Sequence, residues 1–164
     1  MNLSAAWLNR DRRMSLSLEA SMLKQIPMFR DVELPKLKLL ALASERLSYA
    51  PGEAVFHEGD LPDAVYVILS GAVEVLRDSQ SGQVRVAELR EGAIVGEVAV
   101  LCDSLRTASI SAVGPVSALK IEKRTFLEMM MQTPQLAMAV NKELARRLEG
   151  LTAAFAAAQQ GDKA

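Results

Sequence analysis

The hydrophobic positions of the first 50 residues recur at the spacing of an α-helix. Leu18, Met22 and Ile26 are four residues apart and therefore share one helical face. Pro27 follows them and predicts the end of that helix. A second helix is predicted after Asp31, whose side chain is a suitable N-cap. The apolar face of this second helix is formed by Leu34, Leu37, Leu40 and Ala41.

After residue 50 the helical spacing gives way to short apolar runs separated by turn residues. Pro51-Gly52 and Gly59-Asp60 are turn signals, and residues 78–83 predict a hairpin loop between two alternating runs. The runs predicted as strands are 54–56, 65–69, 72–76, 84–89, 94–95, 108–113 and 116–121. Many short strands separated by turns are typical of an antiparallel sandwich or jelly roll.

The helical pattern returns after residue 121. A short helix is predicted within residues 125–133. Thr133 followed by Pro134 is a typical helix start, because threonine is an N-cap and proline suits the first turn. This last helix is expected to run to about Gln159, and its apolar stripe consists of Ala137, Val140, Leu144, Leu148, Leu151 and Phe155.

The stripe on the last helix has two interpretations. It packs on the strands of the same chain, or it forms the seam of a homodimer. The second interpretation is supported by a seven-residue repeat, which consists of Ala137, Leu144, Leu151 and Ala158. The pattern alone leaves both open.

These elements predict one domain. A chain of 164 residues, half of them hydrophobic, is long enough to bury one core and to add a helix. The predicted segments are an N-terminal extension (1–17), an N-terminal helical segment (18–50), a β-roll (51–121), C-terminal helices (122–159) and a tail (160–164).

Composition excludes several classes of site. The net charge of −1 gives no whole-chain reason to expect a nucleic-acid or anionic-membrane surface. One cysteine, Cys102, cannot form an internal disulfide, and one histidine, His57, excludes a multi-histidine metal site. No apolar run approaches the roughly 20 residues that cross a bilayer. The N-terminus lacks the apolar core of a signal peptide, so a cytoplasmic location is expected.

The segment Gly96–Ser109 combines an acid, Glu97, with a base, Arg106, nine positions later among small and apolar residues. A buried charge is costly unless a partner compensates it, so the two residues either neutralise each other or bind a ligand. Gly96 allows a close approach of the backbone to an anion. Arg106 can bind a phosphodiester through two parallel hydrogen bonds. The segment therefore predicts a phosphate site.

The remaining polar groups of this segment fit a nucleotide. Thr107 adds a hydroxyl, and its own N–H or that of Ala108 can also donate to a phosphate. Glu97 has no role facing a phosphate, but it can accept a hydrogen bond from a sugar hydroxyl while Arg106 balances part of its charge.

The segment resembles the phosphate-binding cassette of the cyclic-nucleotide-binding domain family, which includes the catabolite activator protein, kinase regulatory subunits and gated channels. The cassette match is carried by residues 95–101 and 106–108, within a predicted cassette at 95–109. A second signature of the family lies upstream, at Gly59, Asp60, Tyr66, Val67 and Gly71. The resemblance covers about residues 18–150. It implies an α+β fold, an eight-stranded antiparallel β-roll flanked by N-terminal helices and a long C-terminal helix.

The resemblance also implies a role for each site residue. Glu97 takes the ribose 2′-hydroxyl, and Arg106 holds the cyclic phosphate. The other cassette residues that contact the ligand are Gly96, Val98, Ala99, Thr107 and Ala108. Channel-type members place an arginine of the last helix on the base, and the corresponding position here is Arg147, which could equally be an exposed helix residue.

The expected function is that of a regulatory module for cAMP or cGMP, without a metal or catalytic group. The module passes a conformational change through its last helix to an effector protein or a second copy. No DNA-binding domain and no membrane span are expected in this chain. The alternative is an interaction module that retains the fold and binds another small anion or no ligand. A cupin-type enzyme usually needs several histidines, and His57 is the only one.

Overall fold

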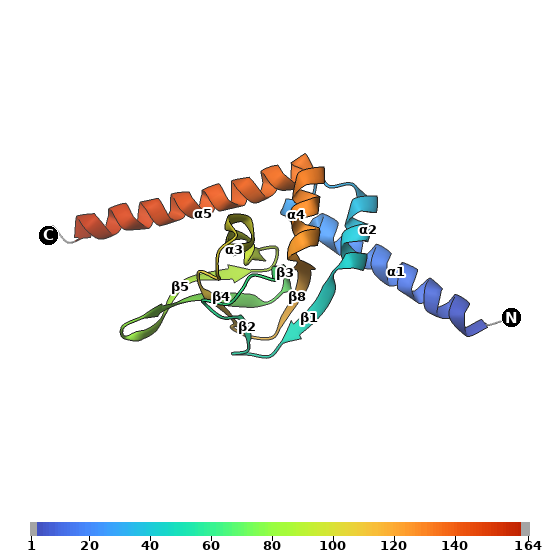
Figure 1. The fold of residues 1–164 in the computed structure, drawn as a ribbon, viewed down its shortest axis with the longest axis horizontal. Helices are drawn as coiled ribbons and strands as arrows, with labels where there is room; N and C mark the ends of the chain where they lie inside the picture. The colour runs from blue at the N-terminus through green and yellow to red at the C-terminus, as the bar shows by residue number, and fades with distance from the viewer. Residues whose placement is uncertain (1–2, 162–164) are drawn as a thin grey trace.

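The protein is described by a computed structural model that places residues 3–161 (Figure 1). Eight strands form two four-stranded antiparallel sheets, ordered β1-β8-β3-β6 and β2-β7-β4-β5. The strands are β1 (Glu45–Tyr49), β2 (Ala54–Phe56), β3 (Ala64–Ser70), β4 (Ala72–Ser79), β5 (Gly82–Arg90), β6 (Ile94–Val95), β7 (Ser109–Ala112) and β8 (Val116–Glu122). The predicted α+β fold with an antiparallel β-roll is confirmed.

Five α-helices and one short 3-10 helix accompany the sheets. They are α1 (Leu3–Gln25), η1 (Pro27–Phe29), α2 (Leu34–Ala43), α3 (Glu97–Cys102), α4 (Lys123–Gln132) and α5 (Pro134–Gly161). Helices α1, α2, α4 and the first turns of α5 lie together at one side of the roll. From there α5 extends across the view to the other side, and the free ends of α1 and α5 point in opposite directions (Figure 1). No helix in residues 3–161 is long and apolar enough to cross a membrane.

Three predicted boundaries near the N-terminus are wrong. β1 begins at Glu45, inside the segment 18–50 that was expected to be helical, because Ser44 is extended and residues 45–49 pair with β8. α1 begins at Leu3, within the predicted extension 1–17. The N-cap of α2 is Glu33 and not Asp31, because the buried Val32 still belongs to the turn after η1. Of the predicted tail 160–164, residues 162–164 lie outside the described chain.

Two cores meet at β3. One lies between the two sheets, and the other lies between the β1-β8-β3-β6 sheet and the helices. Tyr66 and Ile68 of β3 face the first core, whereas Val65 and Val67 face the second. A strand that is buried on both faces needs a continuous apolar run, which explains the sequence AVYVIL.

Helix α5 is packed at its beginning and exposed at its end. Leu136 and Val140 are buried against the helical core. Leu148, Leu151 and Phe155 are 66–67% exposed and lie in the second half of α5, whose free end points away from the other helices (Figure 1). The predicted apolar stripe therefore packs on the same chain only in its first half.

Gly71 links β3 to β4 with a φ of +87°, and a Cβ at this position would overlap the carbonyl oxygen of Pro115. Gly59 has the same φ of +87° but open space around it. Both alanine variants therefore carry the cost of a left-handed residue, about 1–2 kcal/mol. Gly71→Ala is expected to lose roughly 2 kcal/mol more in unfolding free energy than Gly59→Ala, because backbone must also move. Urea denaturation measures both, and equal losses would contradict the close approach.

Candidate functional site

Gly96 and helix α3 join β6 to the loop that carries Arg106. Gly96 is the N-cap of α3 in a left-handed conformation with a φ of +81°. A Cβ there would overlap Nη1 of Arg106. Glycine is therefore required for two reasons, its backbone angle and the close passage of a guanidinium group.

Arg106 lies inside the protein. Its residue is 2% exposed, and its Cζ lies 4.0 Å from the centroid of the Phe56 ring. Nη1 donates to the carbonyl of Gly96 at 2.7 Å, and Nη2 donates to the carbonyl of Ala64 and, at 3.4 Å, to Asp63 Oδ1. Nε is buried and has no hydrogen-bond partner among the described residues. A buried cationic donor without an acceptor is costly, so this N–H is suited to an incoming anion.

Asp63 is the counter-charge of Arg106. It also accepts from Nζ of Lys120 at 3.1 Å. Partial burial would raise the pKa of Asp63, but the hydrogen bond and charge of Lys120, and then the charge of Arg106, outweigh burial and hold this pKa below its ordinary value. Burial lowers the pKa of the Arg106 guanidinium, and Tyr66 and Asp63 oppose this effect. An arginine remains protonated nevertheless.

The loop of the upstream signature holds the backbone of Arg106. The N–H of Gly59 donates to the carbonyl of Arg106 at 2.8 Å, and the N–H of Arg106 donates to the carbonyl of Asp60 at 2.9 Å. The N–H of Glu58 donates to Oγ of Ser109 at 2.8 Å. The two signatures are therefore parts of one hydrogen-bonded structure.

Glu97 is paired with Arg147 and not with Arg106. The carboxylate side chain is 2% exposed, and its Oε1 accepts from Nη1 of Arg147 at 2.6 Å. No hydrogen bond of Arg106 reaches it, and the charge of Arg106 is the smallest of the influences on the pKa of Glu97, which it lowers. Burial raises the pKa of Glu97, and the positive charge of Arg147 is the largest opposing influence.

Arg147 is held by three acceptors from two parts of the chain. Besides Glu97, its Nη2 donates to the carbonyl of Ile94 at 2.8 Å and its Nε donates to Glu143 Oε1 at 3.2 Å. Arg147 is half-buried, so it is not the plain exposed helix residue considered from the sequence. Its contact with a base stays a prediction.

One cavity of about 110 Å³ brings the predicted site residues together. Phe56, Val75 and Leu89 are among the apolar residues of its wall. The predicted site residues that line it are Gly96, Glu97, Val98, Ala99, Arg106, Thr107, Ala108 and Arg147. The cassette residues lie in one segment, and Arg147, which the family resemblance had assigned to the site, joins them from 41 positions beyond Arg106.

Three side chains that shape this site were not found from the sequence. They are Phe56, which stacks on Arg106, Asp63, which pairs with it, and Glu143, which holds Arg147. Glu143 is four residues before Arg147 on α5, and this i,i+4 spacing was the one available signal. Phe56 and Asp63 lie 50 and 43 residues before Arg106 in the sequence.

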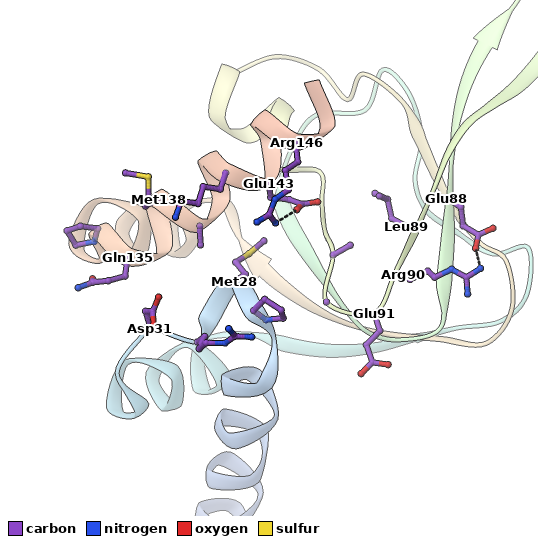
Figure 2. A pocket seen from close by; sticks show the side chains of 17 residues that line it. Met28, Asp31, Glu88, Leu89, Arg90, Glu91, Gln135, Met138, Glu143 and Arg146 are labelled. Atoms are coloured by element: carbon purple, nitrogen blue, oxygen red, sulfur yellow. Dashed lines mark ion pairs between the residues drawn. The ribbon is translucent and has the colours of Figure 1, made fainter. Parts of the chain in front are cut away.

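A larger cavity of about 950 Å³ lies between η1, the turn after β5 and the first turns of α5 (Figure 2). Charges of both signs line it, and they form local ion pairs, Arg90–Glu88 at 2.7 Å and Arg146–Glu143 at 3.7 Å. Glu143 lines this cavity but not the smaller one.

Sequence comparison relates the chain to a known family. A sequence profile of the cyclic nucleotide-binding domain matches residues 46–133. The chain is 30% identical over 120 residues to the lysophospholipase NTE1 of Chaetomium globosum, and 32% identical over 117 residues to that of Pyricularia oryzae. These matches cover 72% and 70% of the chain but only 8% of each relative, so the chain spans a small part of them.

Structural comparison gives the same fold. The catabolite activator protein of Thermus thermophilus superposes with a TM-score of 0.69 at 28% identity, covering 79% of this chain and 61% of that protein. The regulatory domain of Toxoplasma gondii PKA, crystallised with cAMP, superposes with a TM-score of 0.70 at 19% identity, covering 79% and 50%. At 19% identity the second likeness concerns the fold alone.

The Glu97–Arg147 pair predicts a titration behaviour. In Arg147→Ala the pKa of Glu97 should rise further, because burial then acts without its main opposing charge. Since the folded pKa exceeds the unfolded one, the carboxyl group stabilises the fold below the unfolded pKa, and this contribution is lost as pH rises through the folded pKa. NMR titration of the Glu97 side-chain carboxyl carbon measures the shift.

Arg146→Ala is the matched control for that titration. It removes the same charge from the next residue, whose exposed guanidinium pairs with Glu143 and not with Glu97. The pKa of Glu97 should then stay close to its wild-type value. An equal pKa in both variants would contradict the assignment of Arg147 as the controlling charge.

Proposed function

The chain belongs to the cyclic nucleotide-binding domain family, and on that premise we propose that it is a regulatory module that binds cAMP or cGMP in the 110 Å³ cavity. The observation that carries the proposal is the buried guanidinium of Arg106, whose Nε has no acceptor within residues 3–161. A cyclic phosphate supplies one negative charge and acceptor oxygens at a site where a cation is already desolvated.

The other lining residues contact different parts of the nucleotide. Glu97 accepts a hydrogen bond from the ribose 2′-hydroxyl, which is a neutral group with one O–H donor. Gly96, Val98 and Ala99 offer backbone N–H groups at the first turn of α3, and Thr107 and Ala108 complete the phosphate contacts. The exposed hydroxyl of Thr107 is available to a guanine base as well, so cGMP is a candidate equal to cAMP.

The cavity must widen to admit a nucleotide. Its volume of about 110 Å³ is below the roughly 300 Å³ at which ligand pockets for small molecules begin. Both charged recognition residues are nearly inaccessible, Arg106 at 2% and Glu97 at 1% exposure. Binding is therefore coupled to a change in the lining, which is the requirement for a sensor.

We propose regulation and not catalysis as the role of this chain. The lining contains no cysteine, serine or histidine, and its one hydroxyl side chain, Thr107, has no hydrogen bond to a basic group among the described residues. The shared region is 8% of the lysophospholipases, so their catalytic activity does not follow from this match. The effector that reads the nucleotide signal is proposed to be a partner protein or a second copy.

Removal of the Arg106 guanidinium should weaken nucleotide binding strongly. Arg106→Ala is expected to cost about 2–5 kcal/mol in binding free energy, because a desolvated charge partner is lost. Arg106→Lys keeps the charge but not the planar fork, so it should fall between wild type and Arg106→Ala. Calorimetric titration with cAMP and with cGMP measures the series.

The control for this series is Arg124→Ala, which removes an exposed arginine of α4 that pairs with Glu128 at 3.0 Å. Its affinity should equal that of the wild type. Each variant is checked for a cooperative thermal transition before titration. Equal affinities in folded Arg106→Ala and wild type would disprove the assignment of the phosphate site.

The exposed half of α5 is proposed to form a homodimer. The seven-residue repeat continues there through Leu151, and Leu148 and Phe155 extend the same exposed stripe. Burying large apolar side chains that are two-thirds exposed favours association. The output helix would then also be the contact between copies.

Leu151→Glu tests the dimer. A charge in the centre of the stripe should raise the dimer dissociation constant by about tenfold or more, since each 1.4 kcal/mol is a factor of ten. Ala153→Glu adds the same charge on the opposite side of α5 and should leave association unchanged. Sedimentation velocity measures both, and a monomeric wild type at every concentration would refute the dimer.

A further inference from the structure

We infer that α5 locks the nucleotide cavity through Arg147, which acts as a latch on Glu97 that an incoming nucleotide must displace. The inference rests on the proposed function and adds its regulation. Removal of a residue that contacts the ligand weakens nucleotide binding, whereas removal of Arg147 as a latch should strengthen it. The contacts of Arg147, the burial of Glu97 and the position of Glu143 carry it.

The first step concerns access to Glu97. A sugar hydroxyl has to approach a carboxylate oxygen to about 2.7 Å to form a hydrogen bond. The Glu97 side chain is 2% exposed, and Oε1 is already bonded to Nη1 of Arg147 at 2.6 Å. Arg147 is the arginine that lines the cavity from α5. A ribose that binds Glu97 has to share the carboxylate with this guanidinium or displace it, and the latch is the second case.

The second step concerns how firmly the guanidinium is held. Arg147 donates to Glu97, to the carbonyl of Ile94 and to Glu143, so each of its three nitrogen atoms has an acceptor. Two of these acceptors, Ile94 and Glu97, lie in β6 and at the first residue of α3, and the third, Glu143, lies on α5 itself. The latch thus ties α5 to the turn between β6 and α3. A base contact by Arg147 would require it to give up the bonds to Glu97 and Ile94.

The third step is energetic. If the latch has to open before binding, the apparent affinity equals the affinity of an open cavity multiplied by the fraction of molecules in which the latch is open. A nucleotide then releases α5, and by linkage anything that draws α5 away strengthens nucleotide binding by the same factor. The exposed end of α5 is a surface to which such a partner can bind.

Glu143 allows the latch to be changed without touching the ligand. It accepts from Nε of Arg147 at 3.2 Å, but it faces the larger cavity and does not line the nucleotide cavity (Figure 2). A substitution at Glu143 therefore alters affinity without a contact to the nucleotide, through its bond to Arg147 and through its negative charge near Glu97. This separates a latch from a residue that contacts the nucleotide.

The test is calorimetric titration of the full chain with cAMP and with cGMP. Arg147→Ala should bind the nucleotide about tenfold more tightly than the wild type, which corresponds to the loss of about one partly buried ion pair. Glu143→Gln should bind about threefold more tightly, because it weakens one of three holds on the latch. Arg146→Ala is the control, and its affinity should stay within twofold of the wild type.

The sign of the Arg147→Ala effect decides between interpretations. Weaker binding would overturn the latch and favour the base contact implied by the family resemblance. Unchanged binding in both Arg147→Ala and Glu143→Gln would overturn it as well. Tighter binding in both, with Arg146→Ala unchanged, supports it.

A second measurement does not need a nucleotide. Hydrogen exchange of residues 94–102 and 137–148 should accelerate in Arg147→Ala and not in Arg146→Ala, because only the first breaks the tie between α5 and the cassette. If no variant binds either nucleotide while this acceleration is present, the proposed function fails and the tie stands. If exchange is unchanged, the latch itself is refuted.

Discussion

Glu97 and Arg106 are charged side chains that are almost fully buried in one small cavity, and the structure around them follows from the need to compensate those charges. A buried ion without a partner costs several kcal/mol, so each must be paired or bound. The fold supplies a separate partner for each, Asp63 from the loop before β3 for Arg106 and Arg147 from α5 for Glu97. The cassette is thereby connected to the β-roll on one side and to the last helix on the other.

In the proposed function, this separation of partners allows one cavity both to bind a ligand and to change the position of α5. Had Glu97 and Arg106 neutralised each other, a ligand would perturb only the cassette. Because Glu97 is neutralised by Arg147, any group that takes over its carboxylate changes the hold on α5. The second half of α5 carries exposed apolar side chains, on which the proposed contact with a second copy or a partner would form.

The sequence was informative where the pattern is local and where the cassette residues are contiguous. Alternating valines and paired turn residues placed seven of the strands, and Thr133-Pro134 marked the start of α5. β1 was missed because ERLSY is short and polar and becomes a strand only through pairing with β8. The cassette residues could be predicted as a site because a glycine, an acid and an arginine follow one another at fixed spacing. Each has a separate role, in close backbone approach, in accepting from a sugar hydroxyl and in binding a phosphate.

The partners of the buried charges could not be predicted, because they are set by tertiary packing over long sequence separations. Asp63 is 43 residues from Arg106, and Arg147 is 50 residues from Glu97. No local pattern distinguishes Asp63 from the other acids of its loop. Arg147 was distinguished from its neighbour Arg146 only by the family resemblance, and its pairing with Glu97 becomes visible only when α5 approaches the cassette.

The most direct measurement is the NMR spectrum of the arginine Nε–Hε groups before and after addition of cAMP or cGMP. The Nε of Arg106 has no acceptor among the described residues, and that of Arg147 is bonded to Glu143. We predict that both resonances move on saturation, Arg106 on gaining a phosphate oxygen and Arg147 on leaving Glu97, while that of the distant Arg124 stays in place. Saturating nucleotide that leaves the Arg106 and Arg147 signals unmoved would contradict a phosphate site at Arg106 and a latch at Arg147.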